Sequence, residues 1–229
     1  MATPRDYDTD PERFRLATRV TGRYLTGTRG QHEHVAEALA AAGAGLVLDI
    51  GCGEGALSAA APAACRVVGL DASPAMLSRH PRPAVRAEAT ALPFAAGTFD
   101  AAVAVNVLYY LGDPVAAIAE ARRVLAPGGT FITACPARSD SPELAGVWRP
   151  ERSTFDAEDA PDLVGRVFGP VEAEWWDAPL ITLPDRDAVG DYLIARCVPP
   201  PEARAAAARL RTPITLTKRG VFVYARKSA

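Results

Sequence analysis

The sequence contains no apolar run that approaches the roughly 20 residues a helix needs to cross a bilayer. Its opening residues, MATPRD, also lack the apolar segment of a secretory signal peptide. Both absences predict a cytoplasmic protein that has no membrane partner.

Cysteine is scarce, and basic charge is not in excess. The four cysteines show no metal-ligand spacing, so we expect buried thiols in a reducing compartment and no metal site. The formal net charge is -2, whereas a protein that binds nucleic acid through its phosphates needs a basic surface. We therefore do not expect nucleic acid to be the main partner.

What the sequence does contain is enough apolar material for a sizeable core, because 49% of its 229 residues are hydrophobic. Apolar segments typical of strands alternate with helical patterns, which indicates right-handed crossovers on a parallel sheet. We therefore predict a doubly wound α/β fold. The predicted strands of this core are residues 47–50, 65–70, 84–87, 99–105 and 130–134, and its helices include 75–79 and 115–125.

Two regions lie outside that alternating core. Residues 1–43 predict two helices that form an N-terminal helical cap, in front of a Rossmann-like domain at 44–229. Residues 136–168 are rich in Pro, Asp and Arg and predict a lid-like insertion that ends in a helix within 155–168. Together with the cap, this insertion is expected to cover a crevice at the edge of the sheet.

The most informative stretch is VLDIGCGEG at residues 47–55, which predicts a buried strand, a glycine-rich turn and the start of a helix. In doubly wound folds, nucleotides bind at such a turn after the first strand. Asp49 and Glu54 would oppose a pyrophosphate but favour a ligand with ammonium and sulfonium groups, so the turn favours S-adenosylmethionine. A dinucleotide stays open, because Gly51-x-Gly53 is followed about 20 residues later by Asp71. A turn that binds nothing also stays open.

Three further loops follow consecutive strands and should meet the turn over one crevice. Asp71 ends the second strand, where a carboxylate can accept both hydroxyls of a ribose. Glu88 or its neighbouring amides can contact an adenine ring, or Glu88 is a solvated surface acid. The loop with Asn106, Tyr109 and Tyr110 would lie beside the transferred methyl group, although these tyrosines can equally serve packing.

Together these segments resemble the class I S-adenosylmethionine-dependent methyltransferases, especially the ubiquinone/menaquinone-biosynthesis-like group of small-molecule enzymes. The matching motifs are LDIGCGEG at 48–55, GLDASPAML at 69–77, EATALPF at 88–94 with GTFD at 97–100, and LAPGGT at 125–130. The resemblance implies a Rossmann-like, seven-stranded, mostly parallel sheet, with the two late strands at 171–176 and 221–226 and the last one antiparallel. It also implies S-adenosyl-L-methionine as the cofactor and S-adenosyl-L-homocysteine as its product.

By the same resemblance, Asp49 and the glycine turn flank the methionine part of the cofactor. Asp71 would hold the ribose, and Glu88 with Ala89 the adenine edge. Two positions depart from the family pattern, since Glu88 replaces the usual Asp and Tyr110 stands where a histidine is common. The expected cofactor-binding residues are Asp49, Gly51, Cys52, Gly53, Asp71, Ala72, Met76, Glu88, Ala89, Thr90 and Asn106.

The expected reaction is methyl transfer to an O, N or C atom of a small-molecule metabolite by in-line displacement, carried out by a monomer or homodimer. Alignment of the acceptor can supply most of the acceleration, although an acceptor of high pKa also needs a base. The candidate catalytic residues are Tyr109, Tyr110 and His34, and His32 and Asp140 are further candidate bases.

Two alternatives to a small-molecule methyltransferase stay open. One is an rRNA or tRNA methyltransferase on the same fold, which would need a basic rim. The other is a protein that binds the cofactor without methylating. The residues that offer a small basic rim are Arg204, Arg209, Arg211, Lys218 and Arg219.

Overall fold

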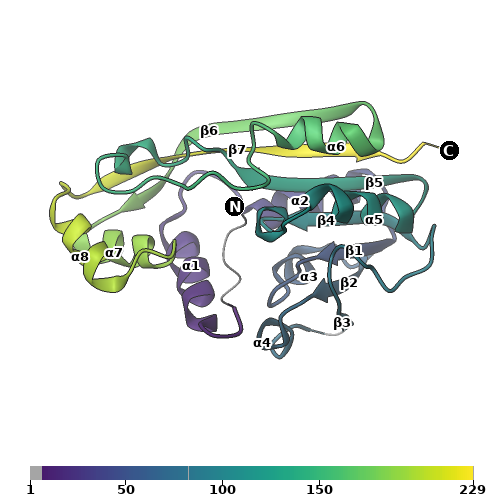
Figure 1. Cartoon of the computed structure of the whole chain (residues 1–229), viewed down its shortest axis with the longest axis horizontal. Helices are drawn as coiled ribbons and strands as arrows, with labels where there is room; N and C mark the ends of the chain where they lie inside the picture. Colours follow the sequence, from purple (N-terminus) through teal and green to yellow (C-terminus); the bar gives the residue numbers. More distant parts are fainter. Residues whose placement is uncertain (1–6, 82, 229) are drawn as a thin grey trace.

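The structure, a computed structural model, describes residues 7–81 and 83–228. Its centre is a seven-stranded sheet in the order β3-β2-β1-β4-β5-β7-β6 (Figure 1). Strands β1 to β5 run parallel, and β7 is antiparallel to β5 and β6. The predicted doubly wound, mostly parallel sheet is confirmed. The strands are β1 (Leu46–Ile50), β2 (Arg66–Asp71), β3 (Ala84–Arg86), β4 (Phe99–Val105), β5 (Leu125–Pro136), β6 (Val171–Leu183) and β7 (Ile214–Arg226).

Four of the helices, α1 (Pro11–Tyr24), α4 (Pro74–Leu77), α5 and α7 (Arg186–Ile194), begin at a side-chain cap. Asp113 accepts a hydrogen bond from the Ala116 amide at 3.0 Å and starts α5 (Pro114–Val124), as its sequence predicts. Helix α6 (Ala160–Phe168) lies within the predicted range 155–168, and it follows a local turn in which Ser153 Oγ donates to Asp156 Oδ1 at 2.6 Å. Among the described residues, no helix is long and apolar enough to cross a membrane.

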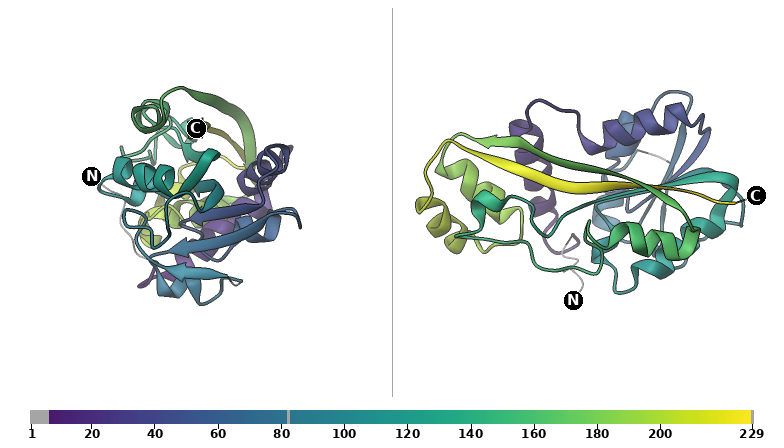
Figure 2. Two further views of the ribbon diagram at one scale, coloured as in Figure 1. Left: turned by 90° about the vertical axis from the view of Figure 1, so that its right-hand side faces the viewer. Right: turned by 90° about the horizontal axis from the view of Figure 1, so that it is seen from above.

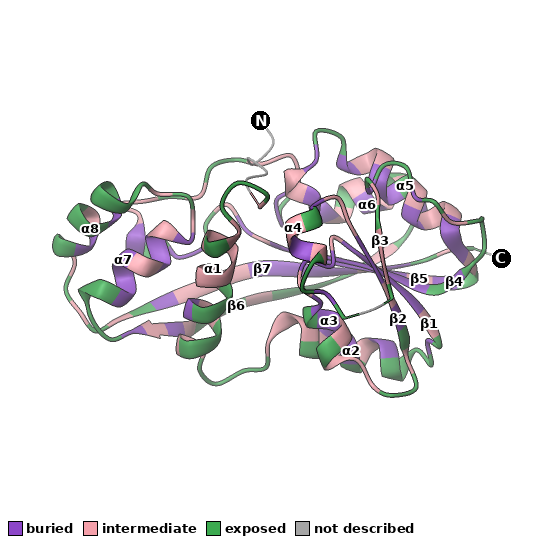
Figure 3. Cartoon of the chain, turned by 90° about the horizontal axis from the view of Figure 1, so that it is seen from below, coloured by how far each residue is buried: buried purple, intermediate pink, exposed green. Residues whose placement is uncertain are grey.

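Alternate residues of the central strands point to opposite faces of the sheet and build two apolar clusters. On one face, Leu48 and Ala102 pack with residues of α5 and α6. On the other, Val47 and Val103 pack with α2 (Gln31–Ala41) and α3 (Ala56–Ala60). Figure 3 shows buried residues along the central strands and exposed ones on the outer sides of the helices. The sheet is therefore covered on both faces.

A third apolar cluster lies beyond the sheet and defines what we call the cap lobe. Strands β6 and β7 are each 13 residues long and extend from the sheet into this lobe (Figure 2). The lobe has its own core around Tyr192 and Leu193, so it is more than a loop. The cap lobe consists of α1 (Pro11–Tyr24), η2 (Pro142–Leu144), α7 (Arg186–Ile194), α8 (Pro200–Ala208) and the far ends of β6 and β7.

The predicted cap of residues 1–43 divides between these two parts of the molecule. Helix α1 packs against α7 and β6 in the cap lobe, whereas α2 packs against α3 and β4 on the sheet. The predicted insertion at 136–168 divides in the same way, because Leu144 joins the cap-lobe core and Phe155 joins a sheet core. Residues 1–6 of the predicted cap lie outside the described residues. The sequence also predicts helices at 185–196 and 202–210, and these are α7 and α8, which lie outside the two predicted covering regions and supply much of the lobe.

Candidate functional site

The glycine-rich turn after β1 has a left-handed backbone. Gly51 has a φ of 73°, and its amide donates to the Leu70 carbonyl at 2.7 Å. A Cβ atom on Gly51 would overlap the Val107 side chain. The position therefore requires glycine for its backbone and for the close approach of the loop that follows β4.

Asp71, the last residue of β2, ties this turn to the next loop. Its carboxylate accepts from the Gly53 amide at 2.9 Å and from the Ser73 amide at 2.9 Å. Ser73 itself caps α4 (Pro74–Leu77), because its Oγ accepts from the Met76 amide at 3.2 Å. Asp71 is thus a positioned acceptor at the carboxyl edge of the sheet, and the helix cap is a separate residue.

Asp49 lies behind this carboxylate and is only 3% exposed. Burial and the neighbouring Asp71 charge raise the pKa of Asp49 to about 7. An uncompensated buried carboxylate is unfavourable, so a positively charged ligand would stabilise its ionised form. The predicted cofactor carries an ammonium, a sulfonium and a ribose, and this pair of acids fits it better than it fits a pyrophosphate.

The loop after β3 joins the same edge. The Ala87 amide donates to the Asp71 carbonyl at 3.1 Å, which brings the following residues beside the second loop. Ala89 is buried there, whereas Glu88 and Thr90 are exposed. An exposed acid at this place is accessible to a ligand that lies across the edge.

Asn106 has a different environment from the acids. Its φ is 54°, and its Nδ2 donates to Gln31 Oε1 at 2.6 Å in the first turn of α2. It thereby holds the loop after β4 to the helix on one face of the sheet. The other predicted cofactor residues line the first two loops, with Cys52, Gly53 and Met76 buried and Ala72 partly buried.

The predicted N-terminal cap reaches this edge through residues that the sequence analysis did not single out. Asp8 accepts from Ser73 Oγ at 2.6 Å, and a Cβ atom on Gly53 would lie 3.3 Å from the Phe14 ring. Arg15 Nε donates to Glu54 Oε1 at 2.7 Å, so the charge of Glu54 is paired within the protein. The acids that can face a cationic ligand are therefore Asp49 and Asp71, and Glu54 instead anchors α1.

Tyr109 and Tyr110 lie in the 3-10 helix η1 (Leu108–Tyr110) and form a cluster with Tyr7. The ring centroids are 4.5 Å apart for Tyr109 and Tyr110, and 5.1 Å apart for Tyr110 and Tyr7. Tyr7 also packs edge-on against Phe14, with centroids 5.7 Å apart. The cluster therefore runs from Phe14 in α1, the ring over Gly53, to Tyr109, which packs against a core of the sheet.

Burial raises the pKa of Tyr109 and of Tyr7 well above the usual value for a phenol, and raises that of Tyr110 as well. At neutral pH these phenols keep their protons. They can donate hydrogen bonds to a substrate, and this arrangement does not favour either predicted tyrosine as a general base.

The structure separates His34 from the tyrosines. Its ring stacks on Phe222 with centroids 4.2 Å apart, and its Nε2 lies 2.8 Å from the Tyr224 hydroxyl and 3.3 Å from Glu174 Oε2. Phe222 belongs to the α2–α3 face of the sheet, whereas Tyr109 packs against the α5–α6 face. His34 and Tyr109 thus occupy opposite faces.

The two further candidate bases lie elsewhere. Burial lowers the pKa of His32, which lies in the first turn of α2. Asp140 is in the cap lobe, where its carboxylate pairs with Lys218 and accepts from the Arg219 amide at 2.9 Å. Neither residue adds a base beside the tyrosine cluster.

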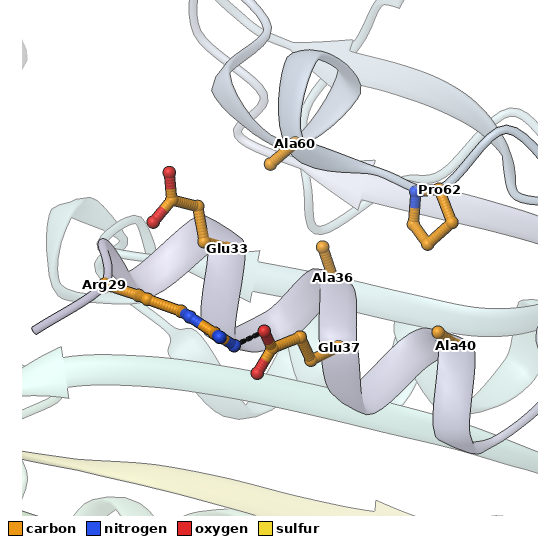
Figure 4. A pocket seen from close by; sticks show the side chains of 7 residues that line it. All are labelled: Arg29, Glu33, Ala36, Glu37, Ala40, Ala60 and Pro62. Atoms are coloured by element: carbon orange, nitrogen blue, oxygen red, sulfur yellow. Dashed lines mark ion pairs between the residues drawn. The ribbon is translucent and has the colours of Figure 1, made fainter.

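A surface hollow lies between α2 and α3, and Figure 4 shows its lining. Its volume is about 360 Å³, and an ion pair between Arg29 and Glu37 borders it. None of the predicted site residues lines it. The remaining lining residues are Glu33, Ala36, Ala40, Ala60 and Pro62.

Comparison with known proteins agrees with this geometry. Residues 48–133 match the model of the methyltransferase domain family. The chain is 37% identical over 115 residues to a probable S-adenosylmethionine-dependent methyltransferase of Mycolicibacterium smegmatis, which covers 47% of this chain and 45% of that protein. It is 38% identical over 113 residues to the demethylmenaquinone methyltransferase of Renibacterium salmoninarum, covering 47% and 48%.

The fold extends over more of the chain than the sequence similarity does. A crystal structure of an S-adenosylmethionine-dependent methyltransferase from Thermotoga maritima, a possible histamine N-methyltransferase, superposes with a TM-score of 0.63 at 18% identity and covers 97% of this chain and 98% of that one. In contrast, the chain spans less than half the length of the curated relatives it matches. The sequence similarity therefore concerns the sheet and its glycine turn, and the cap lobe is shared only at the level of fold.

Proposed function

We propose that this chain, whose residues 48–133 match a methyltransferase domain, is a class I S-adenosylmethionine-dependent methyltransferase that methylates an O, N or C atom of a small-molecule metabolite. The observation that carries the proposal is the pair Asp49 and Asp71, one buried and one partly buried, beside the glycine turn. Phe14 approaches Gly53 of the same turn, and Tyr7 and Tyr110 continue the aromatic cluster from it. The acids suit a cationic cofactor, and the aromatic rings suit a flat organic acceptor.

The residues that would hold the cofactor are the acids and the backbone of the turn. Asp49 would face the positively charged methionine part, Asp71 the ribose, and Glu88 with Ala89 the adenine. The cofactor supplies a methyl group bonded to a positively charged sulfur, which makes that methyl reactive without further activation. The protein then has to bind, orient and exclude water.

The chain offers residues for each of those tasks. Asp8 and Arg15 fix the N-terminal segment over the turn through Ser73 and Glu54. Phe14 lies next to Gly53, so this segment would keep water away from the reacting atoms. The Tyr109 and Tyr110 hydroxyls, protonated at neutral pH, would orient an acceptor by donating hydrogen bonds.

The acceptor atom should have a lone pair that can react without a protein base to remove a proton first. The tyrosine cluster holds protonated phenols, and His34 lies on the other face of the sheet. An amine, or an oxygen acid that ionises near neutral pH, can then react through alignment alone. An acceptor of high pKa would need a base outside the groups that surround the cluster.

The RNA alternative has little support in the described residues, because most of its basic rim is already paired. Lys218 pairs with Asp140, Arg219 with Asp177 and Arg204 with Asp191. A phosphate backbone requires exposed, uncompensated cations. A small-molecule acceptor is therefore the proposal we retain.

Separation of cell extract into small-molecule and RNA fractions tests the proposal. Each fraction is incubated with the protein and S-adenosylmethionine, and mass spectrometry follows S-adenosylhomocysteine and methylated products. We expect both products in the small-molecule fraction, and a slower reaction by Asp71→Ala when the cofactor concentration is below saturation. Methylated RNA would support the alternative, and cofactor binding without product in either fraction would contradict methylation.

Calorimetry gives a second test at the level of binding. S-adenosylhomocysteine should bind, because its ammonium and ribose meet Asp49 and Asp71. NAD should not bind, because its pyrophosphate would face the same two acids. NAD binding without a response to S-adenosylhomocysteine would overturn the cofactor assignment.

A further inference from the structure

Arg196, just after α7, is held rigidly at the boundary between the cap lobe and the tyrosine cluster. Its guanidinium carbon lies 3.3 Å from the centroid of the Tyr192 ring, and its Nη1 donates to the Tyr192 carbonyl at 3.1 Å. Tyr192 is fully buried, so its ring is a fixed platform. A guanidinium stacked in this way is ordered before any ligand arrives.

A buried polar network fixes the platform from the other side. The Tyr192 hydroxyl lies 2.9 Å from Ser141 Oγ and accepts from Lys218 Nζ at 2.9 Å. Lys218 also pairs with the buried Asp140 carboxylate. The ammonium charge of Lys218 is thus neutralised inside the lobe and is not offered to a ligand.

Arg196 differs from Lys218 in this respect. Within residues 7–81 and 83–228, no carboxylate forms an ion pair with its guanidinium. Its contacts are the Tyr192 ring and one backbone carbonyl, which leave N–H donors of the planar group for another acceptor.

The charge of Arg196 acts on the phenols at the sheet edge. Burial raises the pKa of Tyr109, and the charge of Arg196 acts in the opposite direction, which places the guanidinium within electrostatic reach of that hydroxyl. The chain next to Arg196 also contacts α1, because Arg13 Nη1 donates to the Ala195 carbonyl at 3.2 Å. The guanidinium carbon of Arg13 is 5.8 Å from the Tyr7 ring centroid. Two cations and three protonated phenols therefore surround one region, which is rich in donors.

We propose that Arg196 binds a carboxylate group of the methyl acceptor, which makes the acceptor a small organic acid. The inference rests on the proposed function, because it places the acceptor at the tyrosine cluster. A carboxylate matches the planar guanidinium through two parallel hydrogen bonds, and protonated phenols can donate to the same group. The aromatic rings of Tyr7 and Tyr110 would cover the apolar part of such an acid.

The test uses the protein saturated with S-adenosylhomocysteine. A set of aromatic and aliphatic carboxylic acids, each paired with its primary amide, is titrated by ligand-observed NMR. We expect the acids to bind roughly tenfold to a hundredfold more tightly than their amides, the range for charge-assisted hydrogen bonds. Equal binding of acid and amide, or binding of neither, overturns the proposal without any variant. A phosphate monoester that binds more tightly than the acids would overturn the carboxylate assignment.

Three variants assign the preference to this residue. Arg196→Gln should remove it, and Arg196→Lys, which keeps the charge without the planar fork, should retain only part of it. Arg209→Gln, which removes an exposed charge from the same lobe, should leave it unchanged. A full acid preference in Arg196→Gln would contradict the proposal, and Arg196→Lys gives the same test if the glutamine variant does not fold.

The readouts separate this inference from the proposed function. Failure of the wild-type protein to bind S-adenosylhomocysteine would defeat the proposed function itself. Normal binding of S-adenosylhomocysteine, together with no acid preference, would defeat only the role of Arg196. In a turnover assay with an accepted acid, Arg196→Gln should raise KM more than it lowers kcat, because the residue binds the acceptor away from the reacting atoms.

Discussion

The glycine-turn edge and the cap lobe differ in how far apart along the chain their bonded residues lie. At the edge, Asp71 accepts from amides 18 and 2 positions away. In the cap lobe and at its boundary, Lys218 bonds to a residue 78 positions away and Arg13 to one 182 positions away. The glycine-turn edge, which we call the cofactor half, is thus specified by local backbone geometry. The cap lobe, which we call the acceptor half, depends on contacts between segments that are distant in sequence. The five predictions that follow test how independent the two halves are.

Asp140→Ala should give the largest loss of stability, because it leaves the Lys218 ammonium without its carboxylate in a lobe where Lys218 is 16% and Asp140 6% exposed. Removal of one partner of a buried pair costs about 3–5 kcal/mol. Urea unfolding should show this loss, whereas the affinity for S-adenosylhomocysteine should stay unchanged.

A double variant, Asp140→Leu with Lys218→Met, is the control for Asp140→Ala. It removes both charges and should recover most of the lost stability. If Asp140→Ala abolishes cofactor binding as well, the lobe and the sheet edge are one cooperative unit and the comparison fails.

Gly51→Ala should cause the next largest loss of stability, and this substitution lies in the cofactor half. A Cβ atom there meets Val107 in a left-handed backbone, so we expect a loss of about 2–4 kcal/mol from overpacking and strain together. Gly97→Ala is a matched control, because Gly97 has the same φ of 73° with open space around it. It should lose only about 1 kcal/mol. Equal losses in chemical denaturation would show that the close approach to Val107 is unimportant.

Asp71→Ala should weaken binding of S-adenosylhomocysteine by about 1–3 kcal/mol, the usual loss for a charge-assisted hydrogen bond. It should also reduce stability by about 1–2 kcal/mol, since the Gly53 and Ser73 amides lose their acceptor. Asp113→Ala removes a helix cap on α5 and should reduce stability without changing affinity. Unchanged calorimetric affinity in Asp71→Ala would refute the ribose assignment.

Asp49→Asn should change how stability depends on pH. The folded-state pKa of Asp49 is raised to about 7, above the value in the unfolded chain, so the folded state binds the extra proton between about pH 4 and 7. Stability of the cofactor-free protein should then fall as pH rises through this range, by at most about 1.4 kcal/mol per pH unit. The asparagine variant should lack this component in urea titrations at several pH values. A pH profile identical to that of the wild-type protein would show that Asp49 titrates normally.

Arg15→Gln should have the smallest effect, because it removes one partly exposed ion pair between α1 and the glycine turn. Such pairs contribute about 0.2–1 kcal/mol. We expect faster hydrogen exchange at residues 7–15 and faster release of S-adenosylhomocysteine. Arg19→Gln, on the exposed side of α1, serves as the control and should change neither rate.

The two halves also differ in how much of them the sequence predicts. Short sequence motifs predict the sheet, the glycine turn and the Asp71 loop, because a strand, a left-handed glycine and a helix cap each depend on neighbouring residues. A cap of residues 1–43 over this edge was predicted, but the contacts of Asp8 and Phe14 with the turn were not, since they depend on packing between segments distant in sequence. Likewise, the sequence around residue 34 predicts a helix, but it does not predict which face of the sheet this helix covers. His34 therefore could not be placed against Phe222 from the sequence.

The long pair β6 and β7 has a mechanical consequence for the relation between the halves. At roughly 3.3 Å per residue, strands of this length form a ribbon of about 40 Å that belongs to the sheet at one end and to the cap lobe at the other. Their register shifts between Pro179 and Ile181, in the part of the ribbon that enters the lobe, and such irregularities increase the local twist. The twist of this two-stranded ribbon therefore contributes to the angle at which the lobe faces the cofactor edge. Deletion of Leu180, which would restore the register, should rotate the lobe as a unit and change the small-angle scattering profile while both cores stay folded.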